Sequence, residues 1–99
     1  IEILYQPSQR KNSKEAFRGF INLFDDYLAT DLFDKIDTPI QLIWGEKDPW
    51  ESLSEAKDWL KKFKNIRRLD IVKGAGHCPH DEDPEVTNSL IYEFIQETK

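Results

Sequence analysis

Two short stretches of this sequence concentrate side chains that could act together in acid–base chemistry. Residues 45–50 read Gly-Glu-Lys-Asp-Pro-Trp, and residues 74–83 read Gly-Ala-Gly-His-Cys-Pro-His-Asp-Glu-Asp. Each stretch follows an apolar run, and open α/β sheets place their sites at the carboxyl ends of the strands. If both runs are neighbouring parallel strands, Asp48 and His77 emerge at one rim. An Asp48 carboxylate that accepts a hydrogen bond from His77 would fix the imidazole tautomer and support its charge when His77 acts as a base.

The elements that must position these residues begin at Pro39. The apolar run 40–44 predicts a buried strand, and the run 66–72 predicts a second strand with Leu69 and Ile71 on one face. Between them, Ser52 and Glu55 form a capping box that starts a helix. The apolar face of that helix is expected to consist of Leu53, Ala56, Trp59, Leu60 and Phe63.

The second strand leads into a loop over 73–83 and a final helix. Asp83 is the expected N-cap of this helix and Pro84 its first residue. The helix is expected to bury Val86, Leu90, Ile91, Phe94 and Ile95. The order strand, helix, strand, helix is typical of a parallel sheet, so the predicted fold class is α/β with a β-α-β-α unit over 39–99.

The first 38 residues differ from the remainder. Residues 1–13 are polar and predicted to be irregular, whereas residues 14–28 predict a helix with Ser13 as its N-cap. Residues 31–38 are a predicted connector. The apolar face of the helix requires a surface to pack against, and its members are Phe17, Phe20, Ile21, Phe24 and Leu28.

Length and composition restrict the classes of protein. The 99 residues allow one domain, and the absence of Met together with an Ile start leads us to expect missing upstream sequence. The net charge of −5 argues against nucleic acid as a partner. No apolar run is long enough for a transmembrane segment, and the single Cys78 excludes an internal disulfide and favours a reducing, intracellular compartment.

The second stretch allows other interpretations. Cys78 beside a histidine is a conceivable nucleophile, but Pro79 follows it directly and a packed thiol is favoured. A zinc site would need the crowded group of His77, Cys78, His80 and Asp81, which rarely closes a tetrahedron, so no metal is expected. We expect His80 to hydrogen-bond within its loop. The acidic residues are expected to complement the positive end of the last helix, and they are Asp81, Glu82, Asp83 and Glu85.

Residues 38–50, Thr-Pro-Ile-Gln-Leu-Ile-Trp-Gly-Glu-Lys-Asp-Pro-Trp, followed by Gly-Ala-Gly-His at 74–77, resemble the C-terminal part of an α/β-hydrolase. The resemblance covers about 36–97 and implies that 39–99 is the C-terminal core of such a domain. It makes 1–38 a segment that connects cap to core. The sequence around Asp48 and His77 is most similar to the plant and cyanobacterial group that includes pheophytinase and chlorophyll dephytylase. That similarity implies hydrolysis of a bulky apolar ester, without a cofactor, in the cytoplasm or a plastid.

One family feature is absent from the sequence. The family's nucleophile lies in Gly-x-Ser-x-Gly, but none of the five serines has a glycine two residues away, and no Asp is flanked by glycines. The resemblance therefore implies a Ser-His-Asp triad in which Asp48 orients His77 and the nucleophile lies upstream, so the chain alone is expected to be inactive. Two alternatives remain. One is a non-catalytic interaction module whose sheet edge pairs with the missing N-terminal portion or a second copy, and the other is a fragment of a C–C or epoxide hydrolase.

Overall fold

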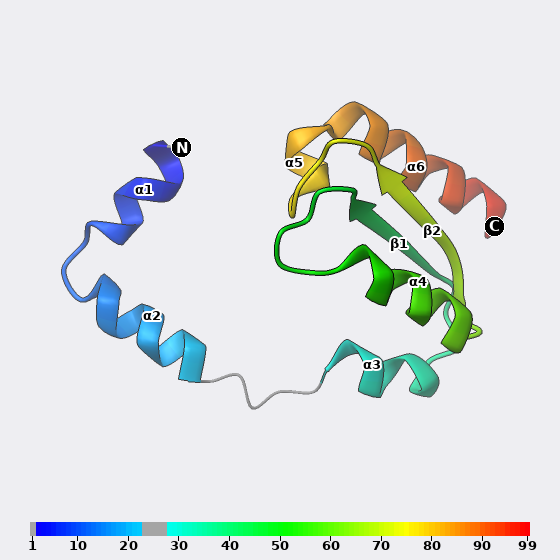
Figure 1. Cartoon of the computed structure of the whole chain (residues 1–99), viewed down its shortest axis with the longest axis horizontal. Helices are drawn as coiled ribbons and strands as arrows, with labels where there is room; N and C mark the ends of the chain where they lie inside the picture. The colour runs from blue at the N-terminus through cyan, green and yellow to red at the C-terminus, as the bar shows by residue number, and fades with distance from the viewer. Residues whose placement is uncertain (1, 23–27) are drawn as a thin grey trace.

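The computed structural model describes residues 2–22 and 28–99. Two helices precede the gap, and the remaining elements follow it (Figure 1). In chain order the elements are α1 Glu2–Ser8, α2 Ser13–Asn22, α3 Ala29–Leu32, the 3-10 helix η1 Phe33–Lys35, β1 Ile40–Gly45, α4 Leu53–Lys62, β2 Ile66–Val72, α5 Pro79–Glu82 and α6 Pro84–Glu97.

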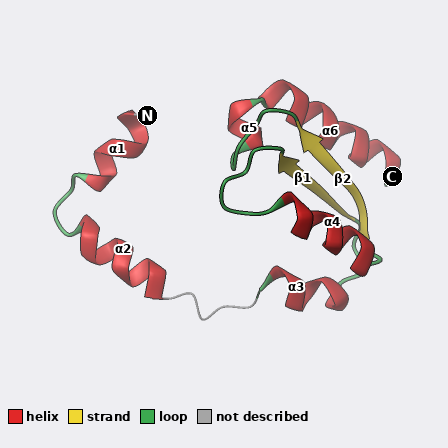
Figure 2. Cartoon of the chain, in the orientation of Figure 1, coloured by secondary structure: helices red, strands yellow, loops and turns green. Residues whose placement is uncertain are grey.

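Strands β1 and β2 pair in parallel, from Ile40 beside Ile66 to Gly45 beside Val72, with one irregularity after Ile40. Both predicted strands and the helix between them are confirmed, and the fold is a mixed α/β structure. Helices α4 and α6 flank the strands (Figure 2). Successive side chains of a strand point to opposite faces of the sheet, so β1 contacts α4 on one face and α6 on the other. Trp44 meets Trp59 of α4, whereas the Gln41 amide donates to the Leu90 carbonyl of α6.

The α4 side of the sheet holds a small aromatic core. Ala56 and Phe63 are fully buried, and the ring of Phe33 meets the edges of Trp59 and Phe63 at centroid distances of 5.7 and 5.1 Å. Ser52 caps α4 by accepting a hydrogen bond from the Ser54 amide. The second half of the predicted capping box, a hydrogen bond from the Ser52 amide to the Glu55 side chain, is not formed in the described part of the chain.

On the α6 side of the sheet, ion pairs connect β2 to the helix. The Arg68 guanidinium donates to Asp70 Oδ2 at 2.7 Å, to Glu93 Oε2 at 2.8 Å and to Glu97 Oε1 at 2.9 Å. The hydrogen bonds to Glu93 and Asp70 are the main reason that the pKa of Arg68 is raised above its ordinary value. Gln41 completes the network by donating to Asp70. These contacts attach the last two turns of α6 to β2.

The prediction for the buried face of α6 is only partly right. Asp83 caps the helix through the Val86 amide, as predicted. The buried residue is Thr87, whose hydroxyl donates to the Pro79 carbonyl at 3.0 Å, while Leu90 and Phe94 are half-buried. The other predicted core residues are exposed, namely Val86, Ile91 and Ile95. Among residues 2–22 and 28–99, the sheet that this helix packs against has two strands, which is too narrow to cover the whole apolar stripe of the helix.

The N-terminal segment also differs from expectation. Residues predicted to be irregular form α1, whose last carbonyls are satisfied locally because Ser8 Oγ donates to Tyr5 O and Ser13 Oγ donates to Ser8 O. Ser13 is therefore not acting as the predicted cap of α2. The predicted helix over 14–28 is confirmed as far as Asn22, while 23–27, including Phe24, lie outside the described residues. Most of its predicted apolar face is exposed, with Phe17 at 64%, Phe20 at 60%, Ile21 at 50% and Leu28 at 68%.

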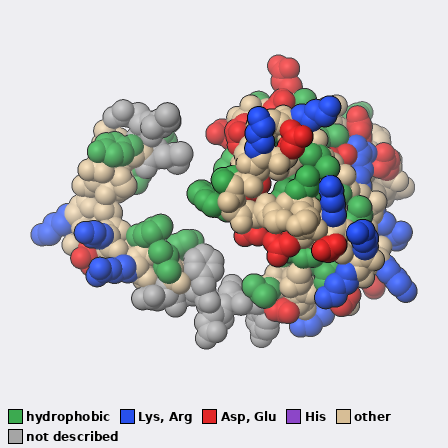
Figure 3. All heavy atoms as spheres, in the orientation of Figure 1, with side chains coloured by type: hydrophobic (Ala, Val, Ile, Leu, Met, Phe, Trp, Pro, Cys, Tyr) green, Lys and Arg blue, Asp and Glu red, His purple; other side chains and the backbone are tan. Residues whose placement is uncertain are grey.

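The surface charge is mixed. Figure 3 shows Lys and Arg side chains on α2 and the turn that precedes it, and basic and acidic side chains interspersed over the part that contains β1 and β2. Within 2–22 and 28–99, no helix combines the length and the apolar character needed to cross a membrane.

Candidate active site

The two loops that carry Asp48 and His77 are joined through their backbones. The Glu46 amide donates to Val72 O at 3.0 Å, and the Lys47 amide donates to Ala75 O at 2.8 Å. Gly45 allows this approach, because a Cβ added there would lie 1.8 Å from the carbonyl oxygen of Gly76. The absence of a side chain at Gly45 therefore lets the ends of β1 and β2 bring both loops to one rim.

Asp48 and His77 meet at this rim. His77 Nδ1 lies 2.9 Å from Asp48 Oδ2. The other carboxylate oxygen, Oδ1, accepts from the amides of Trp50 at 2.9 Å and Glu51 at 3.0 Å. The side chain of Asp48 is only 7% exposed, whereas that of His77 is 41% exposed. The arrangement fixes the carboxylate from its own loop and leaves the imidazole accessible.

Electrostatics favour an ionised Asp48. Burial raises the pKa of Asp48, but the hydrogen bonds from the Glu51 and Trp50 amides and from His77 together outweigh burial and lower this pKa below its ordinary value. An ionised carboxylate can only accept hydrogen bonds, so Nδ1 of His77 carries the hydrogen. In the neutral ring the lone pair then lies on Nε2, which makes no hydrogen bond in the described part of the chain. This is the tautomer that a histidine base requires.

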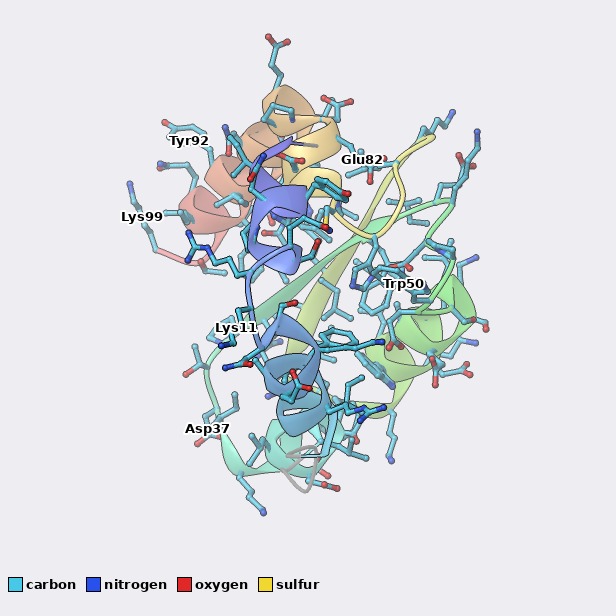
Figure 4. All side chains as sticks on the ribbon, turned by 90° about the vertical axis from the view of Figure 1, so that its left-hand side faces the viewer. Lys11, Asp37, Trp50, Glu82, Tyr92 and Lys99 are labelled. Atoms are coloured by element: carbon cyan, nitrogen blue, oxygen red, sulfur yellow. The ribbon has the colours of Figure 1, made fainter. Side chains whose placement is uncertain are left out.

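A small apolar hollow adjoins the pair. Trp50 meets the His77 ring edge-on, with centroids 4.7 Å apart, and is itself 75% exposed. In Figure 4, Trp50 lies on the loop that follows β1. A cavity of about 130 Å³ lies at the same place and is lined by Ile43, Trp44, Gly45, Asp48, Glu51, His77 and Pro79. The pair therefore borders a recess with aromatic and aliphatic walls.

The other candidates in the second loop lie apart from this pair. Cys78 is an exposed free thiol, which corrects the predicted packed thiol, because it stands on the rim where α5 begins. The predicted loop contains α5, and the side chain of His80 forms no hydrogen bond in the described part of the chain. In that part, no cluster of three or more His, Cys, Asp and Glu residues has the geometry of a metal site.

Sequence reasoning missed two acidic residues that hold the second loop. Glu46 Oε2 accepts from the Gly74 amide at 2.9 Å, and the Glu82 carboxylate accepts from the amides of Gly76 and Cys78. Glu82 was expected to serve the start of the last helix, but it faces back toward the loop. Gly74, with φ of +75°, was the signal that this loop turns sharply and exposes amides to such acceptors.

The lowered pKa of Asp48 predicts a pH-dependent contribution to stability. A group with a depressed folded pKa stabilises the folded chain above its unfolded pKa of about 3.9, and that contribution disappears as the pH falls through the folded value. The stability advantage of the wild type over Asp48→Asn should therefore be larger at pH 5 than at pH 3. Urea unfolding followed by Trp fluorescence measures this difference.

Asp58→Asn is the matched control for this measurement. It removes the same charge from an exposed carboxylate that lies 3.7 Å from Lys61. Its effect on the free energy of unfolding should be small at both pH values, because exposed ion pairs contribute little. If the wild type is more stable than Asp48→Asn by the same free energy of unfolding at pH 5 and at pH 3, the prediction is wrong.

Comparison of the sequence with known proteins finds several hydrolases among its relatives. The chain is 34% identical over 62 residues to human (Homo sapiens) epoxide hydrolase 4, covering 63% of this chain and 17% of that protein. It is 42% identical over 57 residues to chloroplastic pheophytinase of Arabidopsis thaliana, covering 58% of this chain and 12% of the relative. It is also 30% identical over 82 residues to mouse (Mus musculus) monoacylglycerol lipase ABHD6, covering 83% of this chain and 24% of that lipase.

These matches cover only a small part of each relative. The chain spans between 12% and 24% of the length of the three proteins. No family model matches the chain, and no solved structure matches it significantly. The three relatives are nevertheless all α/β-hydrolases, and they carry different names for their activities. The resemblance of this chain to the α/β-hydrolase family, with pheophytinase among its relatives, is therefore confirmed.

Proposed function

We propose that the chain contributes the base and the orienting acid, His77 and Asp48, to an α/β-hydrolase that cleaves a carboxylic ester. The observation that carries the proposal is the 2.9 Å contact between His77 Nδ1 and Asp48 Oδ2 at the carboxyl ends of two adjacent parallel strands. The two backbone amides on Asp48 Oδ1 support it, since they hold the carboxylate in place while His77 gains and loses a proton.

In the proposed reaction, His77 Nε2 removes the proton from a serine hydroxyl as the serine oxygen attacks the ester carbonyl. The protonated imidazole then gives this proton to the departing alcohol, which leaves an acyl-enzyme. Water, deprotonated by the same nitrogen, hydrolyses the acyl group and frees the serine. Asp48 stabilises the positive ring in both halves of this cycle.

The serine of this proposal lies outside the 99 residues, because none of the five serines stands in a Gly-x-Ser-x-Gly sequence. In this arrangement 39–99 is the C-terminal part of the hydrolase core and 1–38 leads into it. The apolar walls of the recess beside His77 support an apolar ester as substrate, and the similarity to pheophytinase supports a bulky one. The chloroplastic relative and the single cysteine support an intracellular site, in the cytoplasm or a plastid.

A hybrid enzyme tests the proposal. The 82 residues of this chain that match mouse monoacylglycerol lipase ABHD6 replace the corresponding segment of that lipase, which retains the rest of its own sequence. The hybrid should hydrolyse a monoacylglycerol, whereas the 99-residue chain alone should not hydrolyse an aryl ester above background. A folded hybrid without hydrolysis would contradict the proposal, as would aryl esterase activity of the chain alone that is lost in His77→Ala.

Epoxide opening is the second candidate, favoured by the 34% identity to epoxide hydrolase 4. The acid and histidine described here do not discriminate between the two reactions. They differ in the nucleophile, which is a carboxylate in the epoxide case, and no Asp of this sequence is flanked by glycines. A second hybrid, made with epoxide hydrolase 4, that opens an epoxide while the lipase hybrid is inactive would favour this alternative.

A further inference from the structure

The loop that carries His77 is held on both sides of the histidine by one side chain. Glu82 lies at the end of α5, and its two carboxylate oxygens accept from the Gly76 amide at 3.0 and 2.9 Å. Oε1 also accepts from the Cys78 amide at 3.4 Å. Figure 4 shows Glu82 beside the loop that follows β2. The amides directly before and directly after His77 therefore share one acceptor.

We propose that Glu82 is a positioning residue that orients His77 toward Asp48 by holding the backbone amides of Gly76 and Cys78. The proposal deepens the proposed function, on which its catalytic meaning rests. Fixing both neighbouring amides restricts the backbone at His77 and so sets the direction of its side chain. Hydrogen bonds from amides to a charged acceptor are stronger than those between neutral groups, so the restriction is substantial.

The structure keeps the carboxylate itself in place. Helix α5 is attached to α6 at its start, where the buried Thr87 hydroxyl donates to the Pro79 carbonyl, and its single turn is closed by the bond from the Asp83 amide to the same carbonyl. The space at Gly76 fits as well, because a Cβ there would come within 3.1 Å of Glu82 Oε1. This short helix thus presents Glu82 to the amide of a residue that has no side chain in the way.

Glu46 supports the loop at a greater distance from the histidine. It accepts from the Gly74 amide, three residues before His77, and belongs to the same loop as Asp48. Removing this bond frees the start of the second loop but leaves both amides next to His77 in place. Glu46→Gln should therefore disturb the imidazole less than Glu82→Ala, which gives the proposal a graded expectation.

The test is an NMR measurement on the whole 99-residue chain. At a pH where the imidazole is neutral, long-range proton–nitrogen spectra show which ring nitrogen of His77 carries the hydrogen. In the wild type the hydrogen should be on Nδ1. In Glu82→Ala the Nδ1–H population should fall by at least half, and the Gly76 and Cys78 amides should exchange about tenfold faster or more. Strand amides such as that of Leu42 should keep their wild-type exchange rates.

Asp81→Asn is the matched control, because it removes one negative charge from the same helix without removing a bond to the loop. A tautomer change of equal size in this control would assign the effect to charge and overturn the proposal, as would an unchanged tautomer in Glu82→Ala. If Glu82→Ala does not fold, Glu82→Gln replaces it. Because the substituted side-chain amide has a single carbonyl oxygen, the Nδ1–H population of His77 in Glu82→Gln should lie between those of the wild type and Glu82→Ala. A wild-type Nδ1–H population in Glu82→Gln would also overturn the proposal.

The readout separates this proposal from the proposed function. The tautomer of His77 is measured without any substrate, so an inactive hybrid enzyme leaves the result for Glu82 standing. Conversely, an active hybrid combined with an unchanged tautomer in Glu82→Ala and Glu82→Gln overturns only the role of Glu82.

Discussion

His77→Ala in the lipase hybrid should lower kcat by about 10⁴-fold or more, because the proposed reaction assigns removal of the nucleophile's proton to His77 Nε2. Asp48→Asn should cost nearly as much, about 10⁴-fold, for a different reason. The carbonyl oxygen of the substituted side chain can still accept from the Trp50 and Glu51 amides, which turns its NH₂ group toward His77 Nδ1. That ring nitrogen must then accept, so the hydrogen moves to Nε2, where the base needs a lone pair.

The kinetics of the two variants should distinguish their causes. Both lower kcat with little change in KM, since neither residue holds the substrate before the reaction. Because hydroxide takes over proton removal when the correct tautomer is missing, part of the Asp48→Asn loss should be recovered at high pH. His80→Ala is the matched control, since it deletes an exposed imidazole three residues from His77, and its kcat should remain within about twofold of the unmodified hybrid. Equal losses in His77→Ala and His80→Ala would show that the pair has no special role.

The parts of the fold that follow from local pattern could be predicted from the sequence. Apolar runs bounded by Pro39 and Gly45, and a capping pair at Asp83 and Pro84, specify elements through local backbone preferences. The alternation of strands and helices is sufficient to bring Asp48 and His77 to one rim, because parallel strands end on the same side. Their contact at 2.9 Å also depends on Gly45, which lets the two loops approach each other.

What could not be predicted depends on contacts between a side chain of one element and the backbone of a neighbouring element or loop. The apolar spacing of α6 gives equal weight to Leu90 and Ile91, yet Leu90 is half-buried and Ile91 is exposed. Thr87 is buried with its hydroxyl donating to the Pro79 carbonyl, a contact that no periodicity reveals. The role of Glu82 was hidden for the same reason, since a carboxylate ahead of a helix usually serves that helix. Side chains that bind backbone groups of another segment leave little trace in the sequence.

Gly45→Ala is the substitution with the largest expected effect on stability. The new Cβ would lie 1.8 Å from Gly76 O, 2.6 Å from Ala75 O and 2.8 Å from Gly76 C, all of them backbone atoms that cannot turn aside. The two loops must therefore separate, which breaks the bond from the Lys47 amide to Ala75 O. We expect a loss of at least about 3 kcal/mol in the free energy of unfolding, measured in urea, at the upper end for overpacking.

The same separation should damage the site, since Asp48 and His77 are carried by the two loops that move apart. The His77 tautomer should become mixed in whatever fraction of Gly45→Ala remains folded, which links the stability of the rim to its chemistry. Gly19→Ala is the control, because a Cβ there meets nothing within 4 Å and alanine favours the helix by about 0.5–1 kcal/mol. Gly45→Ala with the urea midpoint and the His77 tautomer of the wild type would show that the contact between the two loops does not hold the pair together.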